Sequence, residues 1–393
     1  MVDPAIPYGQ YDPTLLEPVY PQRTRHLEDL AVLLAGKAGQ LTQGLHPIVV
    51  RSLGALVRSM NCYYSNLIEG HRTRPIDIER ALLQDFSSDP EQRNLQLEAK
   101  AHIEVQMLLD FDPAWQVLDV VSPEFIQQIH REFYQRLPDV FWQLDQVAVQ
   151  PGEWRTTNVQ IGRHIPPPPE TLTVFLARFA QVYQPDRLSK VDQILAAAAS
   201  HHRFVWIHPF LDGNGRVVRL FSHAYFQRVG VGNGLWSVSR GLARQMQEYR
   251  ARLAQADQQR RNDYDGRGNL SMAALVSFCE FFLETCIDQI DFMMKLLEPT
   301  QLLARIEANT AIAVQQKSLL PGSFALLKAA FLEGEVARGQ ATAITGYQER
   351  QARSVLKRLL DQGLLVADSP KSAVRLGFPT VAAEQWLPRL WID

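Results

Sequence analysis

Residues 208–219 read His-Pro-Phe-Leu-Asp-Gly-Asn-Gly-Arg-Val-Val-Arg, which is the pattern of a loop that turns into a helix. Gly213 and Gly215 bracket Asn214, and glycines let the backbone approach a ligand closely and adopt positive φ. The first amides of the following helix have no acceptor within it, and the helix dipole favours negative charge there. Phosphate oxygens are natural acceptors for such amides. The stretch therefore predicts an anion-binding loop at a helix N-terminus.

The side chains of the same stretch extend this prediction. Arg216 and Arg219 lie on neighbouring faces of the first helical turn, where their guanidinium groups can bind further phosphates. Asp212 supplies a hard oxygen ligand of the kind that a phosphate-bound Mg²⁺ takes from proteins. His208 is the one group of the loop that can accept a proton near neutral pH. We therefore interpret the stretch as a phosphate site with a general base beside it.

The stretch also resembles the motif of the Fic family, HPFx(D/E)GNGRxxR, and matches it at every specified position. The alternative is a glycine-rich helix start with an incidental histidine, but this motif is far more specific than a lone GxGxxG. The resemblance implies nucleotidyl transfer, most often of AMP from ATP to a protein hydroxyl, with His208 as the base and Mg²⁺ at Asp212. The nucleotide-binding residues would be Gly213, Asn214, Gly215, Arg216 and Arg219.

A second segment, Ser65-Asn66-Leu67-Ile68-Glu69-Gly70, ends the helix predicted from His46 onward. Ser65 and Glu69 share one face because they are four residues apart, and Gly70 fits a helix terminator. By itself the segment is typical of a solvated carboxylate near a helix end. It also resembles the inhibitory motif of the Fic family, (S/T)xxxE(G/N), placed upstream of the core as in the class with an N-terminal inhibitory helix. We therefore expect Glu69 to pair with Arg219 and to keep the ATP γ-phosphate from binding productively.

Composition sets the broad class. The 393 residues indicate two or three domains, and a net charge of −2 gives no global attraction to nucleic acid or membranes. No apolar run approaches the roughly twenty residues that span a bilayer. The opening segment does not resemble a secretory signal. The three cysteines lack metal-ligand spacing and suit a reducing compartment. We therefore expect a cytoplasmic protein without a membrane partner.

We expect a mostly α-helical chain, with a Fic helical core, a small β-hairpin flap and a C-terminal winged-helix domain. The expected boundaries are 1–120 for an N-terminal helical region with the inhibitory helix, 121–297 for the catalytic core, 298–317 for a linker helix and 318–393 for a winged helix-turn-helix. Residues 1–43 are interpreted as a strap across the body. The acidic and Gln-rich faces of the helices predicted between 71 and 150 are interpreted as ordinary surface.

Residues 152–162 alternate like a hairpin, and the prolines at 166–169 predict an extended exit. One interpretation is a packing hairpin followed by a Pro-rich linker. The other resembles the flap of the Fic family, which clamps the target segment as an added strand so that its hydroxyl faces the base.

Residues after the motif bear on which base is bound. Tyr249 matches the position where the Fic family usually has the first of two tyrosines that flank the adenine. Arg250 stands at the second position, and Asp257 stands where an Asn often reads the base. ATP is therefore the first choice, and another nucleoside triphosphate stays open. His201 and His202, which precede the motif, are interpreted as structural residues.

The C-terminal pattern predicts helices at 323–332 and 348–362 and strands at 364–367 and 374–378, which is the order of a winged helix-turn-helix. Arg350, Arg353 and Lys357 share an outward face suited to phosphates or a major groove. From residue 318 onward nine Lys or Arg oppose seven Asp or Glu, far short of a strongly basic DNA reader. DNA binding and a protein-docking or homodimerising role both stay open.

These features together predict transfer of AMP from ATP to a Ser, Thr or Tyr hydroxyl of a target protein, which could be the enzyme itself, with Glu69 as the inhibitor. Two alternatives stay open. The same site could remove AMP from a modified protein, with Glu69 orienting a water molecule. The chain could instead be a DNA-binding transcriptional regulator whose nucleotide pocket senses ATP.

Overall fold

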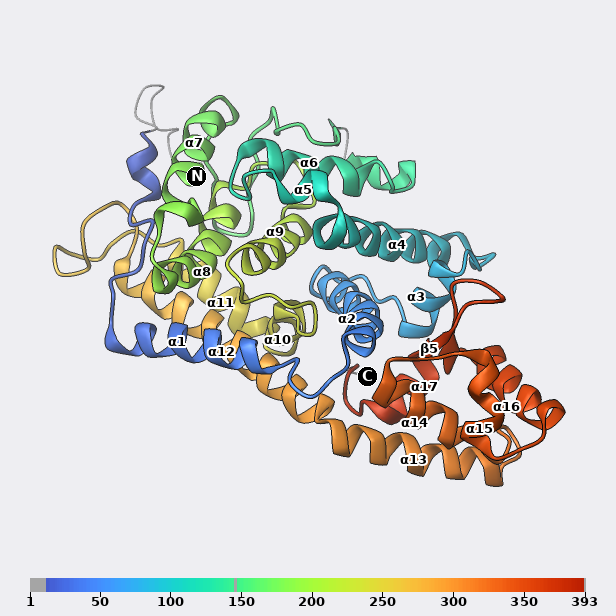
Figure 1. Ribbon diagram of the computed structural model, residues 1–393. Coiled ribbons are helices and arrows are strands. Elements are labelled where there is room, and N and C mark those ends of the chain that lie inside the picture. The colour runs from blue at the N-terminus through green and yellow to red at the C-terminus, as the bar shows by residue number, and fades with distance from the viewer. Residues whose placement is uncertain (1–11, 145–146, 392–393) are drawn as a thin grey trace.

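The computed structural model describes residues 12–144 and 147–391, and it is mostly α-helical (Figure 1). The helices of the body are α1 (Arg25–Gln40), α2 (Pro47–Ile68), α3 (Pro75–Leu82), α4 (Pro90–Phe111), α5 (Pro113–Gln116), α6 (Pro123–Tyr134), α7 (Leu172–Tyr183), α8 (Lys190–Ile207), α9 (Asn214–Arg228), α10 (Val238–Arg244), α11 (Met246–Ala256) and α12 (Met272–Leu297). Short 3-10 helices lie at Pro13–Leu16, Asp139–Trp142, Pro169–Thr171, Pro185–Arg187 and Arg338–Gln340. Helices α2 to α6 each begin with a proline, whose fixed φ suits the first helical position.

Helices α8 and α9 pack against each other in the middle of the body (Figure 1). The side chains of residues 196–199 on α8 are four completely buried alanines, which let neighbouring helices approach closely. Phe204 of α8 and Phe221 of α9 both contact Phe179 of α7, at ring-centroid distances of 6.3 and 5.7 Å. Because α8 ends at Ile207 and α9 begins at Asn214, the loop of residues 208–213 lies at the junction of two closely packed helices.

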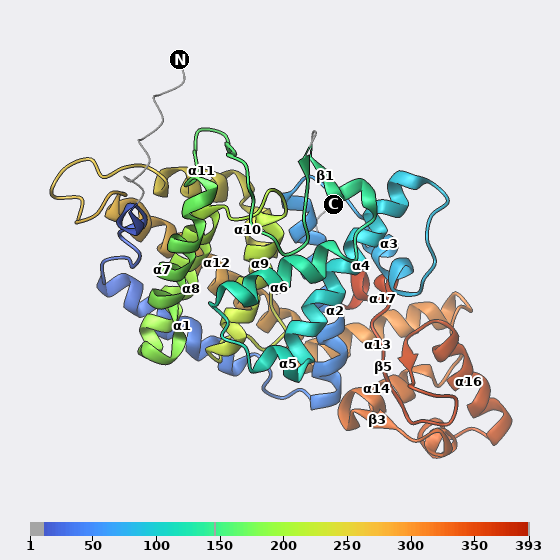
Figure 2. The same cartoon turned by 90° about the horizontal axis from the view of Figure 1, so that it is seen from above.

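Helices α2 and α4 pack against α9 on its other side, as Figures 1 and 2 show. Helix α2 begins after His46, whose Nδ1 accepts from Ile48 N, and it ends at Ile68 with Glu69 as the capping residue. Gly70 has φ +91°, and the next amide, of His71, donates back to Asn66 O at 2.9 Å. The glycine therefore ends the helix with its last residues turned toward α9.

The hairpin is not where the alternation predicted it. The structure places an antiparallel pair at β1 (Gln143–Leu144) and β2 (Val147–Ala148), with Leu144 opposite Val147. Residues 152–162, where we expected the hairpin, form turns and irregular chain, with a single bridge between Ile161 and His164. The prediction failed because this segment is fastened to the body by Arg155 rather than to a partner strand, as the contacts of the site show.

The C-terminal part begins with α13 (Pro299–Gln315), where the linker helix was expected. It continues with α14 (Ser323–Glu333), β3 (Glu335–Val336), α15 (Ala341–Thr345), α16 (Glu349–Asp361), β4 (Leu365–Val366), β5 (Val374–Leu376) and α17 (Thr380–Trp386). The three strands form an antiparallel sheet in the order β3-β5-β4. Val355 and Leu359 of α16 are completely buried, whereas its basic residues point outward.

Both described ends of the chain contact helices of the body. Thr380 N at the start of α17 donates to Glu79 Oε2 of α3 at 2.9 Å, and the chain at Leu390 returns to α2 (Figure 1). At the other end, the completely buried Arg203 of α8 donates to Pro18 O from Nε (3.0 Å) and Nη2 (2.7 Å). The described part of the N-terminal segment is therefore the predicted strap, and residues 1–11 of that prediction lie outside the described residues. Among the helices that the structure describes, none has the length and apolar character needed to cross a bilayer.

Candidate active site

The loop that joins α8 to α9 is held on several sides. His208 has left-handed backbone angles (φ 48°, ψ 61°), which are uncommon for a residue other than glycine and cluster at functional sites. Its N–H donates to Phe204 O at 3.0 Å. Arg155 fastens the next turn, because its N–H donates to Pro209 O (2.9 Å) and its Nε to His208 O (2.8 Å). The predicted base is therefore placed by the backbone of the loop.

The His208 imidazole has the protonation state that a general base needs. Burial lowers its pKa to about 4, helped by the positive charge of Arg155 and by His164. Its Nδ1 is buried and has no hydrogen-bond partner among the residues that the structure describes. The ring is therefore neutral near pH 7 and can accept a proton.

His130, which the sequence did not single out, stabilises the same loop from α6. Its ring stacks on Phe210 with centroids 3.9 Å apart, and Gly152 N donates to its Nδ1 at 2.8 Å. Its Nε2 lies 3.2 Å from Asp212 O, so this nitrogen carries the proton and donates. The Asn214 side-chain amide makes two hydrogen bonds to the backbone of Phe210. It accepts from the Phe210 N–H (3.0 Å) and donates to the Phe210 carbonyl (2.8 Å). The Asn214 side chain thus braces the loop.

Close neighbours leave no room for a side chain at the two glycines of the motif. Gly213 has φ +79°, and a Cβ there would lie 2.7 Å from Cε2 of Tyr134. A Cβ on Gly215 would overlap the Glu69 carboxylate. Glu69 therefore lies directly over the N-terminal turn of α9, where the predicted phosphate site is.

Arg219 is occupied by the segment that we predicted to be inhibitory. Its Nη2 donates to Glu69 Oε1 at 2.6 Å and to Ser65 O at 3.0 Å, and its Nε donates to Ser65 Oγ at 2.9 Å. Burial would raise the pKa of Glu69, but the charges of Arg219 and Arg216 outweigh it and lower that pKa. Glu69 is therefore ionised, and the expected pairing of Glu69 with Arg219 is present in the structure, with Ser65 as a further partner of Arg219.

Arg216 differs from the expectation that it is free for phosphates. Its Nη1 is paired with Glu98 of α4, its Nη2 lies 3.3 Å from Asp212 Oδ2, and its guanidinium lies 5.2 Å from the centre of the Phe133 ring. Only Nε is a buried donor without a partner in the described chain. Two of the three guanidinium nitrogens are therefore engaged within the protein.

Asp212 is oriented by two donors that share one oxygen. Tyr134 Oη donates to Oδ2 at 2.6 Å, and Arg216 Nη2 approaches the same atom. Burial would raise the pKa of Asp212, but Arg216 and the Tyr134 hydroxyl hold it below its usual value. The described residues contain no group of three or more His, Cys, Asp or Glu that could hold a metal ion. A single ionised carboxylate fits Mg²⁺ that is bound mainly by nucleotide phosphates.

Of the residues expected near the nucleobase, Arg250 contacts the end of α2 and Tyr249 and Asp257 contact α8. Tyr249 is buried, and its Oη lies 2.8 Å from Nε2 of His201. Burial raises the pKa of Tyr249 to about 12. Arg250 Nη2 donates to Ile68 O, the last residue of α2, at 3.1 Å. Asp257 Oδ1 lies 3.2 Å from His202 Nε2. His201 and His202 are both completely buried and bonded within the protein, as expected for structural residues.

Comparison with known proteins agrees with this geometry. Residues 120–226 match the model of the Fic/DOC family, and this range includes the whole motif. The chain contains a Fic domain. Protein adenylyltransferase Fic of Drosophila erecta is 28% identical over 168 residues, which are 43% of this chain and 32% of that protein. The protein of the same name from Culex quinquefasciatus is 34% identical over 112 residues, which are 28% of this chain and 21% of that protein. The chain therefore spans a third or less of these relatives.

Solved structures show the same fold over more of the chain. A Fic family protein from Desulfovibrio desulfuricans G20 has a TM-score of 0.54 at 17% identity. The match covers 90% of this chain and 96% of that protein. Residues 134–508 of Fic-1 from C. elegans have a TM-score of 0.55 at 18% identity, over 70% of this chain and 73% of that one. The helical Fic core is thus common to all three proteins.

Outside the Fic motif, the residues that sequence reasoning missed are mostly buried polar groups. The Gln-rich face of α4 was interpreted as surface, but Glu98, His102 and Gln106 are at most 1% exposed. That interpretation was wrong because the face packs against the charged residues of α2 and α9. The available signal was the spacing: polar residues recur every four positions at 98, 102, 106 and 110, which marks one continuous helix face.

Proposed function

We propose that this protein transfers AMP from ATP to a Ser, Thr or Tyr hydroxyl of a protein, and that Glu69 inhibits the transfer. The observation that carries the proposal is the Glu69 carboxylate over Gly215, paired with Arg219 at 2.6 Å. The names of the curated relatives, which are protein adenylyltransferases, support the reaction class. An anion already bound at the helix N-terminus excludes the phosphate that Arg219 would otherwise bind.

In the proposed reaction the neutral His208 imidazole takes the proton of the target hydroxyl. The hydroxyl oxygen forms a bond to the α-phosphorus of ATP, and the bond from that phosphorus to pyrophosphate breaks. The amides of Gly213, Asn214 and Gly215 would bind the phosphates, as would Arg219 once Glu69 has moved away. Asp212 would hold Mg²⁺, which neutralises charge on the phosphates as pyrophosphate leaves.

The target segment would be held by the hairpin of β1 and β2. Leu144 and Val147 are 43% and 40% exposed, so the pair presents apolar side chains to a partner. We propose that the target adds to this hairpin as a strand, the role that the flap of the Fic family implied for residues 152–162. The target could be another protein or a second copy of this chain.

The test uses ATP that carries a radioactive α-phosphate and compares the labelling given by Glu69→Gly with that given by Glu69→Gly/His208→Ala. We expect Glu69→Gly to raise labelling of the protein itself or of a lysate, and Glu69→Gly/His208→Ala to abolish it. Mass spectrometry of the labelled Glu69→Gly protein identifies the transferred group and the acceptor residue. Equal labelling by Glu69→Gly and by the double variant would show that the assigned roles are wrong.

Removal of AMP from a modified protein is the second candidate, because Glu69 is ionised and could orient a water molecule near the site. Incubation of the unmutated enzyme with a target that already carries AMP tests this direction. Release of AMP by the unmutated enzyme but not by Glu69→Gly would favour removal.

The C-terminal part supports a winged helix-turn-helix by its order of helix, strand, two helices and two strands. Arg350, Arg353 and Lys357 are exposed on α16, although Arg353 is paired with Glu349. We propose DNA or a second copy of the chain as its partner. A shift assay with operon promoter DNA, with and without ATP, tests the alternative of an ATP-sensing regulator, which predicts binding that survives His208→Ala.

A further inference from the structure

Glu98 is a completely buried carboxylate that lies between the catalytic loop and the end of the inhibitory helix. Its Oε1 is paired with Arg216 Nη1, and its Oε2 accepts from His71 Nδ1 at 2.7 Å. His71 follows Glu69 by two residues, and the bond to Glu98 raises the pKa of His71. A buried charge is strongly unfavourable unless it is paired. Both oxygens of Glu98 are paired, and one of the partners is a residue of the Fic motif.

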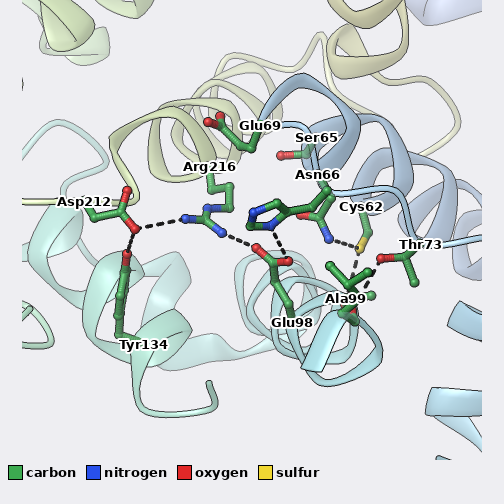
Figure 3. Close-up of polar contacts among 12 residues, drawn as sticks. Cys62, Ser65, Asn66, Glu69, Thr73, Glu98, Ala99, Tyr134, Asp212 and Arg216 are labelled. Carbon is green, nitrogen blue, oxygen red and sulfur yellow. Dashed lines mark hydrogen bonds and ion pairs between the residues drawn. The ribbon is translucent and has the colours of Figure 1, made fainter. Parts of the chain in front are cut away.

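A chain of contacts leads from Glu98 to the predicted metal ligand, and Figure 3 shows its members side by side. Glu98 holds one end of the Arg216 guanidinium, and the other end approaches Asp212 Oδ2 at 3.3 Å. Tyr134 donates to the same Oδ2 at 2.6 Å. Oδ1 is used by neither donor, and the Asp212 side chain is 44% exposed. The side-chain donors therefore hold the carboxylate at one oxygen and leave the other open to a ligand.

We propose that Glu98 is a positioning residue for metal binding, which it controls by keeping Arg216 away from the open oxygen of Asp212. The inference rests on the proposed function, because Mg²⁺ enters with ATP. Without the charge of Glu98, the guanidinium retains Asp212 and Glu69 as its anionic neighbours and pairs with Asp212 through both oxygens. Arg216 then competes with the metal for the atom that should bind it.

The experiment measures binding of an ATP analogue with a methylene bridge between the α- and β-phosphates, by calorimetry, across a series of Mg²⁺ concentrations. All variants carry Glu69→Gly so that the inhibitory carboxylate is absent. We expect Glu98→Gln to raise the Mg²⁺ concentration required for binding by roughly tenfold or more, the range seen when partners of metal ligands are lost. Binding in EDTA should change far less. Tyr134→Phe, which removes the second donor to Oδ2, should shift the Mg²⁺ requirement in the same direction.

Gln106→Ala is the matched control, because Gln106 is equally buried on the same face of α4 but bonds to Asn61. It should lower thermal stability without changing the Mg²⁺ requirement. Glu98→Asp keeps the charge and serves if Glu98→Gln does not fold; its shift should be smaller than that of Tyr134→Phe. An unchanged Mg²⁺ requirement in Glu98→Gln overturns the positioning role. If Glu98→Gln does not fold, an unchanged Mg²⁺ requirement in both Glu98→Asp and Tyr134→Phe overturns it. Either result leaves the proposed function intact. If the Glu69→Gly parent binds no nucleotide, both are overturned.

A separate observation concerns the C-terminal segment, residues 387–391. Tyr64, next to Ser65 on α2, donates from Oη to Leu390 O at 2.8 Å. Arg240 of α10 donates to Arg389 O at 2.8 Å, and its guanidinium lies 5.8 Å from the centre of the Tyr64 ring. Tyr64 and Arg240 are both buried. The segment therefore packs against the turn of α2 that presents Ser65 to Arg219.

We infer that the C-terminal segment holds the inhibitory helix in place, so that a partner which draws this segment away would activate the enzyme. This inference also rests on the proposed function. Tyr64→Phe removes the bond to Leu390 O and keeps the ring. It should raise AMP labelling several-fold when Glu69 is present and should have no effect in Glu69→Gly, where the inhibitor is already lost.

Tyr225→Phe is the control, because it removes an equally buried hydroxyl that donates to Tyr183 O over the same 2.8 Å. It should leave labelling unchanged in both backgrounds. Equal effects of Tyr64→Phe with and without Glu69, or no effect in either, overturn the inference. Labelling that is absent even from Glu69→Gly overturns the proposed function as well.

Discussion

Burial and the neighbouring Arg155 and His164 outweigh the opposing charge of Asp212 at His208. Burial and these neighbours favour the neutral ring, which is the form that accepts a proton. Arg219, in contrast, has a carboxylate partner, because its positive charge is paired with Glu69 at 2.6 Å. At the residue scale, the site therefore combines a proposed base that is neutral at pH 7 with a proposed phosphate-binding arginine that is already paired.

The lowered pKa of His208 predicts an unusual pH dependence. Because this pKa is about 4, the imidazole stays neutral between pH 5 and 7 and becomes protonated only as the pH falls through about 4. We expect kcat/KM of Glu69→Gly to stay high well below pH 6.5 and to fall on the acid side toward pH 4. A pH–rate profile measures this. A fall centred near 6.5 would contradict the environment described for His208.

Gly215→Ala tests the close approach of Glu69. The added Cβ overlaps the Glu69 carboxylate, so we expect the free energy of unfolding to fall by about 1–3 kcal/mol, as in overpacked sites. The same substitution in Glu69→Gly should be less destabilising, because the overlapping carboxylate is gone. Urea unfolding of the four proteins gives the comparison. An equal loss in both backgrounds would mean that Glu69 does not lie over Gly215.

At the scale of elements, the end of α2 determines where Glu69, the proposed inhibitory residue, lies. The turn at Gly70 (φ +91°) reverses the chain, and Arg250 donates to the last carbonyl of the helix. Helix α4 supports this end through Glu98 and His71. The proposed inhibitory segment is therefore held by backbone geometry, by α4 and by Arg250 of α11.

Gly70→Ala should destabilise the protein by about 1–2 kcal/mol, the cost of left-handed angles in a residue with a Cβ. No atom lies within 4 Å of the added Cβ, so the loss reports the backbone alone. Gly36→Ala in α1 also has open space and lacks positive φ, so it should be neutral or stabilising by up to about 1 kcal/mol. Urea unfolding distinguishes the two. A neutral Gly70→Ala would show that the helix end does not need this geometry.

At the scale of the whole molecule, both described ends of the chain pack on the Fic core. The N-terminal strap supplies Pro18 O to Arg203, and the C-terminal segment supplies Leu390 O to Tyr64. The core therefore depends on segments that lie outside the motif region. The C-terminal contact also connects the part of the chain after α13 to α2.

Leu16→Ala tests how much the strap contributes. Leu16 is completely buried, and its truncation should lower the free energy of unfolding by about 2–5 kcal/mol. Leu33→Ala is the control, because Leu33 on α1 is 46% exposed and its loss should change stability by less than about 0.5 kcal/mol. Thermal and urea unfolding measure both. Equal losses would show that the strap is not part of the core.

Much of the site could be predicted from the sequence because it is local. The loop of residues 208–213, the glycines and the start of α9 depend on backbone preferences of neighbouring residues. The hairpin was misplaced because alternation within residues 152–162 cannot show that Arg155 fastens this segment to the loop at His208 instead of to a strand. The buried face of α4 was misread because polar residues at helical spacing are usually solvated.

The sequence by itself determined the helical class through its periodicity, and it determined the loop before α9 and the pair of candidate residues at 69 and 219 through short motifs. Only the tertiary structure decided that Arg216 is paired with Glu98, 118 residues away, and that the C-terminal segment reaches Tyr64, 326 residues away. The physical reason is that a buried charge or hydroxyl takes whichever partner the packing of helices brings within hydrogen-bond distance, and that choice is made in space and not along the chain.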